Sequence, residues 1–115
     1  MPPELRNVDG MLFNPGIESS GPPIGFTPEF QYETTILPLT AGTIAILRTD
    51  GVDEAMNSAS EQFGESRFRE CIRTAAHDPE SICKSLFAAV QAFAGSEPQK
   101  DDITLMAFGR EREST

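Results

Sequence analysis

Residues 43–51, TIAILRTDG, carry the strongest strand signal in this chain. The near-continuous apolar character of Thr43–Thr49 predicts a β-strand that is covered on both faces. Asp50-Gly51, one of the commonest turn dipeptides, then ends the strand. Because Gly51 has no side chain, another group can approach its backbone closely. We therefore expect the central strand of a sheet here, with a carboxylate at its end.

A second carboxylate-bearing strand end is expected near the C-terminus, where Asp101-Asp102 precedes the apolar run Ile103–Phe108. A carboxylate at the end of a buried strand is costly unless it is solvated, hydrogen-bonded or bound to a cation. Two such ends brought together would make a metal site. The ordinary alternative is a turn aspartate at position 50 and two solvated loop acids. Because neighbouring side chains in an extended chain point to opposite faces, at most one of Asp101 and Asp102 is expected to be a direct ligand.

The ligand types at these strand ends indicate which cation would bind. Carboxylates without His or Cys suit hard cations such as Mg²⁺ or Mn²⁺. Two such ions about 3.5–4 Å apart can activate a bridging water for in-line attack on phosphorus, without a side-chain nucleophile. The sequence contains no P-loop and no G-x-S-x-G motif, which agrees with that chemistry. Two carboxylate-bearing ends are nevertheless too few for a complete binuclear site.

The rest of the sequence predicts an α+β fold. Leu5–Phe13, with Asp9-Gly10 at its centre, is typical of a β-hairpin. Residues 14–28 are rich in Pro and Gly and predict a long loop, and the alternating residues 30–36 predict a half-buried strand. The expected order is strands first, then a helix pair and a final strand. That order favours a mostly antiparallel sheet with both helices on one face.

Two longer helices are expected after the central strand. The first begins near Glu65, and Pro79 begins the second, which Gly95 ends. Each has apolar residues at helical spacing along one face. The two apolar stripes consist of Phe68, Cys71, Ile72 and Ala75 in the first helix and of Ile82, Leu86, Phe87, Val90 and Phe93 in the second. A single helical turn is also expected at Val52–Asn57.

The composition disfavours several classes of partner. The 115 residues include 18 acidic and 9 basic ones, a formal charge of −9, which disfavours nucleic acid and anionic membranes. Neither a secretory signal nor a run long enough for a membrane helix is visible, so a cytoplasmic location is expected. Cys71 and Cys83 are expected to be reduced, buried thiols, and His77 an exposed residue between the helices. Their C-x5-H-x5-C spacing offers too few ligands for a zinc site.

Several blocks of the sequence resemble the SpoIIE/RsbU-like bacterial branch of the PPM-type metal-dependent protein serine/threonine phosphatases. The blocks are PPELRNVDGMLF (residues 2–13), GPPIGF (21–26), LPLTAGTIAILRTDGVDEAMN (37–57), FGESRFRE (63–70) and KDDITLMAFGR (100–110). They occur in the family's order and spacing, and they cover nearly the whole chain. By this resemblance, residues 1–115 are identified as the C-terminal portion of a single SpoIIE-like phosphatase domain. Its expected fold is part of a four-layer αββα sandwich.

The resemblance implies roles for particular residues. Asp50 and Asp101 would be metal ligands, Asp102 is the alternative to Asp101, and Gly51 and Glu54 would support the site. The complete domain would bind two Mn²⁺ or Mg²⁺ ions and would hydrolyse phosphoserine or phosphothreonine with a metal-activated water rather than a catalytic side chain. The expected partner is a phosphoprotein substrate, for which the resemblance suggests a phosphorylated anti-sigma-factor antagonist.

The resemblance also indicates what the sequence lacks. Relatives carry, earlier in the domain, an Asp that bridges both metals and a Gly whose carbonyl binds one of them, and this sequence contains no such segment. We therefore expect the chain alone to be a weak metal binder and a poor enzyme. Open sheet edges and apolar faces would favour self-association or pairing with the missing half. The alternative function is a non-catalytic interaction module with an incomplete metal centre. Asn57 matches a family position whose role the sequence does not reveal.

Overall fold

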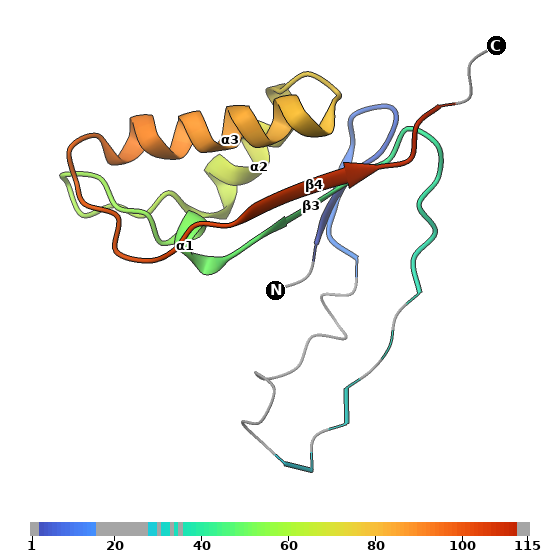
Figure 1. Cartoon of the computed structure of the whole chain (residues 1–115), viewed down its shortest axis with the longest axis horizontal. Coiled ribbons are helices and arrows are strands. Elements are labelled where there is room, and N and C mark those ends of the chain that lie inside the picture. Colours follow the sequence, from blue (N-terminus) through green and yellow to red (C-terminus); the bar gives the residue numbers. More distant parts are fainter. Residues whose placement is uncertain (1–2, 16–27, 30, 33, 35, 113–115) are drawn as a thin grey trace.

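The computed structural model describes residues 3–15, 28–29, 31–32, 34 and 36–112. They form an antiparallel four-stranded sheet in the order β2-β1-β3-β4, with helices packed on one face (Figure 1). The elements are β1 (Glu4–Arg6), β2 (Leu12–Phe13), β3 (Ile44–Arg48), α1 (Asp50–Asp53), α2 (Gly64–Thr74), α3 (Pro79–Ala94) and β4 (Leu105–Gly109). The predicted α+β class, with an antiparallel sheet and a helix pair on one face, is confirmed.

β3 is the central strand, because it pairs with β1 on one side and with β4 on the other. Ile44 and Ile46 point toward the helices and belong to the hydrophobic core. Residues 43–46 are buried, but Leu47, which points to the opposite face, is 38% exposed. The prediction of a strand covered on both faces is therefore right for its first half and wrong for its end.

The two longer helices lie where the sequence predicts them. The Asp78 carboxylate accepts hydrogen bonds from the backbone N–H and the hydroxyl of Ser81, each 2.9 Å long, and so caps the start of α3. These bonds hold the pKa of Asp78 below its ordinary value. Gly95, with φ of +58°, follows the last residue of α3. The buried helix residues are Phe68, Ile72, Ile82, Leu86 and Val90. Phe87, which the apolar stripe assigned to the core, is instead 48% exposed.

The predicted hairpin is confirmed, but the strand at residues 30–36 is not. β1 and β2 pair through a turn in which Gly10 has φ of +89°. Within 30–36, three residues (30, 33 and 35) lie outside the described part, and the other four are not in a strand. Ile36 is 89% exposed, so the alternating pattern does not bury its apolar side there. Residues 16–27 of the predicted loop also lie outside the described part.

β1 carries two buried charged residues that the sequence does not mark as buried. Glu4 is fully buried, and its Oε1 accepts a hydrogen bond from Nε of Arg69 on α2 at 2.9 Å. Arg6 Nη1 donates to the carbonyl oxygens of Ile72 and Ala75, at 2.8 and 2.7 Å. These carbonyls lie at the C-terminal end of α2, where backbone acceptors lack helical partners. The two side chains therefore attach β1 to α2.

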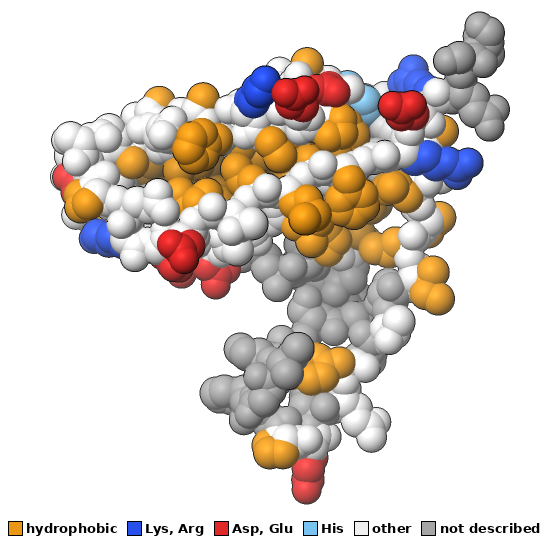
Figure 2. All heavy atoms as spheres, in the orientation of Figure 1, with side chains coloured by type: hydrophobic (Ala, Val, Ile, Leu, Met, Phe, Trp, Pro, Cys, Tyr) orange, Lys and Arg blue, Asp and Glu red, His pale blue; other side chains and the backbone are white. Residues whose placement is uncertain are grey.

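The sheet face opposite the helices is apolar and partly exposed. Its exposed side chains are Phe13, Leu47, Met106 and Phe108, with exposed fractions of 41, 38, 57 and 47%. Hydrophobic side chains gather along the β3–β4 part of the sheet in the space-filling view (Figure 2). A cluster of this kind marks a surface that another layer can cover. No helix within the described residues has the length and apolar character needed to cross a membrane.

We predict that Arg69→Ala lowers the free energy of unfolding by about 3 kcal/mol, because it leaves the buried Glu4 carboxylate without its charged partner. The matched control is Arg73→Ala in the same helix, which removes an exposed pair with Glu70 and costs at most about 0.5 kcal/mol. Urea denaturation followed by circular dichroism measures both losses. Equal losses in the two variants would contradict the structural importance of the Glu4–Arg69 pair.

Candidate metal centre

Asp50 lies at the junction of β3 and the one-turn helix α1. The backbone N–H of Glu54 donates to the Asp50 carbonyl at 2.9 Å and closes this turn, which begins two residues before the predicted Val52. Gly51 and Val52 are buried and anchor the turn, whereas the Asp50 side chain is exposed. The carboxylate therefore extends into solvent from a well-packed turn.

Thr49 joins the end of β3 to the segment that precedes β4. Its backbone N–H donates to the Thr104 carbonyl at 3.1 Å. Its hydroxyl oxygen accepts from the Thr104 N–H at 3.0 Å and donates to the Asp102 carbonyl at 3.2 Å. These three bonds bring the two carboxylate-bearing strand ends side by side.

Gly51 makes the closest contact between the two strand ends. A Cβ atom at this position would lie 2.2 Å from the backbone oxygen of Asp102 and 3.0 Å from its carbonyl carbon. Both obstacles are backbone atoms, which cannot rotate away as the end of a flexible side chain can. The structure thus confirms the expected close approach at Gly51 and shows that the approaching group is the Asp102 carbonyl.

Asp101 and Asp102 have exposed side chains but different surroundings. Asp101 Oδ1 accepts the backbone N–H of Asp102 at 2.8 Å, and the Gln99 side-chain amide donates to the Asp101 carbonyl at 2.9 Å. Asp101 lines the same cavity as Gly51, whereas the residues lining that cavity do not include Asp102. The two neighbouring acids are therefore not equivalent.

The donors present fit a hard divalent cation in type but not in number. Asp50 and Asp101 offer exposed carboxylate oxygens on two segments whose backbones are in contact. Among the described residues, however, no group of three or more Asp, Glu, His or Cys side chains is arranged to hold a metal ion. The described residues thus offer part of a ligand set rather than a closed site.

A salt bridge that the sequence reading missed fixes α1 to β3. Arg48 Nε donates to both carboxylate oxygens of Asp53, each at 3.1 Å. The guanidinium carbon of Arg48 lies 3.7 Å from the centre of the Phe68 ring on α2, and the Arg48 side chain is only 5% exposed. Asp53 lies within the turn that the sequence predicts at Val52–Asn57. Its contact with Arg48 positions the turn that begins at Asp50.

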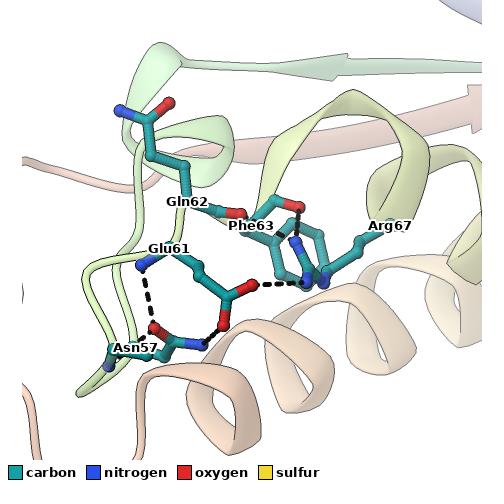
Figure 3. A network of polar contacts seen from close by, with 6 residues as sticks. Asn57, Glu61, Gln62, Phe63 and Arg67 are labelled. Atoms are coloured by element: carbon teal, nitrogen blue, oxygen red, sulfur yellow. Dashed lines mark hydrogen bonds and ion pairs between the residues drawn. The ribbon is translucent and has the colours of Figure 1, made fainter.

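Asn57 organises the loop between α1 and α2 (Figure 3). Its Oδ1 accepts the backbone N–H groups of Ala59 and Glu61, both at 3.0 Å, and its Nδ2 donates to Glu61 Oε1 at 3.1 Å. Arg67 extends the network, because its Nη2 lies 3.9 Å from Glu61 Oε2 and its Nη1 donates to the two carbonyl oxygens just before α2. Asn57 therefore has a structural role, typical of Asn at a turn, rather than a position at the candidate metal centre.

The C-x5-H-x5-C residues form no zinc site among the described residues. Cys71 and Cys83 are free and half-buried rather than fully buried. Burial raises the pKa of both thiols, and the charge of Glu70 adds to the rise at Cys71. His77 is exposed between α2 and α3, as predicted, with its Nε2 2.5 Å from the Gly42 carbonyl oxygen.

A cavity of about 380 Å³ lies beside the two strand ends. Gly51, Glu54 and Asp101 line one side, and the C-terminal half of α3 lines the other. Gly95 and residues 97–100, which follow α3, also line the cavity. No sequence motif predicts this cavity, because its walls come from segments that are far apart in the chain. Glu54, which the resemblance placed beside the metals, is exposed on its rim.

Comparison with known proteins identifies the family. The family model described as Stage II sporulation protein E (SpoIIE) matches residues 2–111. The chain belongs to the SpoIIE family. The phosphatase domain of SpoIIE from Bacillus subtilis, in a manganese-presoaked structure, aligns with the whole chain at a TM-score of 0.71 and 22% identity, and 48% of that domain is covered. The resemblance to PPM-type phosphatases is thereby confirmed, and the fold is that of part of a PP2C phosphatase domain.

Two further relatives support this family assignment. The SiaA-PP2C domain of Pseudomonas aeruginosa aligns with 65% of the SpoIIE-family chain at 32% identity and a TM-score of 0.58, and 31% of that structure is covered. Protein IcfG of Synechocystis is 28% identical over 106 residues, which are 92% of this chain and 16% of IcfG. The chain therefore spans less than half the length of each of these relatives.

We predict that Gly51→Ala displaces the segment that precedes β4, because the new Cβ would collide with the Asp102 carbonyl. The expected loss in free energy of unfolding is about 2–3 kcal/mol, as for other overpacked sites. Two-dimensional NMR of the backbone amides should show shifts at residues 101–104. The control, Gly10→Ala, meets no atom within 4 Å and introduces only the strain of a positive φ, about 1 kcal/mol. Unchanged resonances at 101–104 in Gly51→Ala would refute the contact.

Proposed function

We propose that this SpoIIE-family chain supplies the Asp50 and Asp101 carboxylates of a metal-dependent phosphoserine/phosphothreonine protein phosphatase. The observation that supports this proposal most strongly is the backbone contact between Gly51 and Asp102, which keeps the two strand ends together. A site with carboxylate oxygens and without His or Cys is suited to Mn²⁺ or Mg²⁺. Family membership supports the same chemistry.

The residues of the chain would act by binding and orientation rather than by nucleophilic attack. When bound, the metal ions supply an activated water for attack on phosphorus and offset the charge of the phosphate. Asp50 and Asp101 would hold the cations from the two strand ends, and Gly51 would keep those ends in contact. The Arg48–Asp53 bridge would keep the turn at Asp50 in place. Glu54, on the rim of the cavity, would support the site without direct coordination.

The second layer of the phosphatase sandwich is proposed to cover the exposed sheet face of this chain. That face carries Phe13, Leu47, Met106 and Phe108. The chain covers 48% of the B. subtilis phosphatase domain. The uncovered half of that domain is long enough to form the other layer and to supply further ligands. Without that layer, self-association through the same face is the expected alternative.

The proposed substrate is a phosphoprotein in the cytoplasm, and a phosphorylated anti-sigma-factor antagonist is the candidate that family resemblance suggests. The formal charge of −9 disfavours nucleic acid as an alternative partner. A non-catalytic interaction module is the second candidate function. One observation favours it, namely that no cluster of three metal-binding side chains occurs among the described residues. The two candidate functions differ in whether the complete protein binds manganese and hydrolyses a phosphorylated substrate.

We predict that manganese-dependent hydrolysis of a phosphoserine peptide requires both Asp50 and the N-terminal half of the phosphatase domain. This chain, an upstream-extended version and the extended Asp50→Asn variant are compared by phosphate release. We expect weak or no turnover by the chain alone and turnover by the extended version. In the extended version, Asp50→Asn should lower the rate of phosphate release about 100-fold or more, because losing a direct metal ligand costs at least as much as losing a residue that positions one. The control Asp9→Asn changes an exposed hairpin aspartate and should keep full activity.

An extended chain that neither hydrolyses the peptide nor binds manganese by calorimetry would favour the interaction module. Near-normal turnover by the 115-residue chain would contradict the proposal that the metal site is incomplete. Either result is read only after circular dichroism has shown that the variants are folded.

We further predict that Asp101, rather than Asp102, is the ligand from the second strand end. Asp101 shares the cavity with Gly51, whereas Asp102 contacts Gly51 through its backbone carbonyl, which Asn retains. In the extended protein, Asp101→Asn should weaken manganese binding at least tenfold, as the loss of even an outer-shell partner can. Asp102→Asn should change the manganese affinity less than about threefold. The reverse order in calorimetric titrations would assign the ligand to Asp102.

A further inference from the structure

The cavity beside the strand ends adjoins the candidate metal centre. Gly51 and Asp101 belong to both, so the cavity adjoins the place where a substrate phosphate would bind. Its volume of about 380 Å³ falls in the range of small-molecule sites and suffices for one large side chain. The cavity is therefore placed to contact a residue that flanks the phosphorylated one.

The walls of the cavity are mainly apolar. The apolar side chains that line it include Ala55, Met56, Phe87, Val90, Ala94 and Ile103, and three glutamines line it as well. Phe87 is 48% exposed, although it lies on the apolar stripe of α3, because it faces this cavity and not the core. An aromatic side chain left half-exposed beside an apolar hollow gains contact area when an apolar group enters.

The rim of the cavity is mainly acidic. Glu54, Glu97 and Asp101 lie on it, and Lys100 is the basic residue among those that line the cavity. The Lys100 ammonium lies 3.6 Å from the Met56 sulfur. An acidic side chain entering the cavity would meet three carboxylates against one ammonium, that of Lys100, so net charge repulsion opposes its entry. An apolar side chain meets no such cost.

We propose that this cavity is a specificity pocket for the phosphoprotein substrate, and that it binds a bulky apolar side chain, such as Leu, next to the phosphorylated serine or threonine. The inference rests on the proposed phosphatase function for its position relative to the phosphate. The apolar walls provide the affinity, and the acidic rim rejects acidic neighbours. The pocket thereby selects among phosphoproteins that present the same phosphate group to the metals.

The test measures binding of unphosphorylated peptides, so that neither metal nor turnover contributes. Three fluorescein-labelled peptides carry Leu, Ser or Arg beside the target serine, and their affinities for the upstream-extended protein are measured by anisotropy in EDTA. We expect the Leu peptide to bind about tenfold more tightly than the Ser peptide, since differences of this size are typical of apolar pockets. Equal affinities, or tighter binding of the Arg peptide, would overturn the proposal.

Two alanines at the end of α3 provide matched variants. Ala94 lines the cavity, and Ala94→Leu should fill it and reduce the preference for the Leu peptide to less than about threefold, below the discrimination of about tenfold or more that is typical of apolar pockets. Ala92 is exposed and does not line the cavity, so Ala92→Leu should keep the preference. A preserved preference in folded Ala94→Leu would overturn the proposal. If Ala94→Leu does not fold, Phe87→Ala, an exposed position, replaces it and should also reduce the preference.

A parallel assay separates this inference from the proposed function. Hydrolysis of p-nitrophenyl phosphate, which has no flanking residues, reports on the metal centre alone. If the manganese-loaded extended protein does not hydrolyse p-nitrophenyl phosphate, the phosphatase proposal is contradicted. The peptide affinities in EDTA would still decide whether the cavity selects apolar side chains.

Discussion

The contact between the Gly51 backbone and the Asp102 carbonyl constrains the rest of this structure. It requires glycine at the end of β3, and together with the hydrogen bonds of Thr49 it fixes where the chain enters β4. The position of both candidate metal ligands and one side of the cavity follow from it. The Arg48–Asp53 bridge and the Phe68 ring then hold the adjoining turn in place. A single close approach of two backbones thus links the sheet, the candidate metal centre and the cavity.

Sequence reasoning succeeded where the signal is local. Pro79 and Gly95 mark the ends of α3, Asp9-Gly10 marks the hairpin, and the apolar run after Thr43 marks β3. It failed where the partner is distant. Glu4 is fully buried because Arg69 lies beside it, although the two residues are 65 positions apart, and no spacing rule relates them. The alternating stretch 30–36 illustrates the converse, since its described residues 31, 32, 34 and 36 are not in a strand despite the pattern.

The candidate site could be predicted only in part from the sequence. The strand ends at Asp50 and Asp101 were visible as carboxylates that follow or precede apolar runs, and the resemblance to a phosphatase family gave them a role. The contact that holds them together, and the difference between Asp101 and Asp102, depend on how β4 pairs with β3 and required the structure. The resemblance gave Asn57 no role, and only the structure shows that its side chain organises a loop.

The apolar face of the sheet has a consequence for temperature. Phe13, Leu47, Met106 and Phe108 offer aliphatic and aromatic surface rather than ion pairs. Association through such a surface is driven by the release of hydrating water, and this driving force weakens on cooling. Whatever layer covers the face is therefore held least firmly in the cold. The two layers of such a sandwich would separate more readily near freezing than at growth temperature, although each keeps its own hydrogen-bonded sheet.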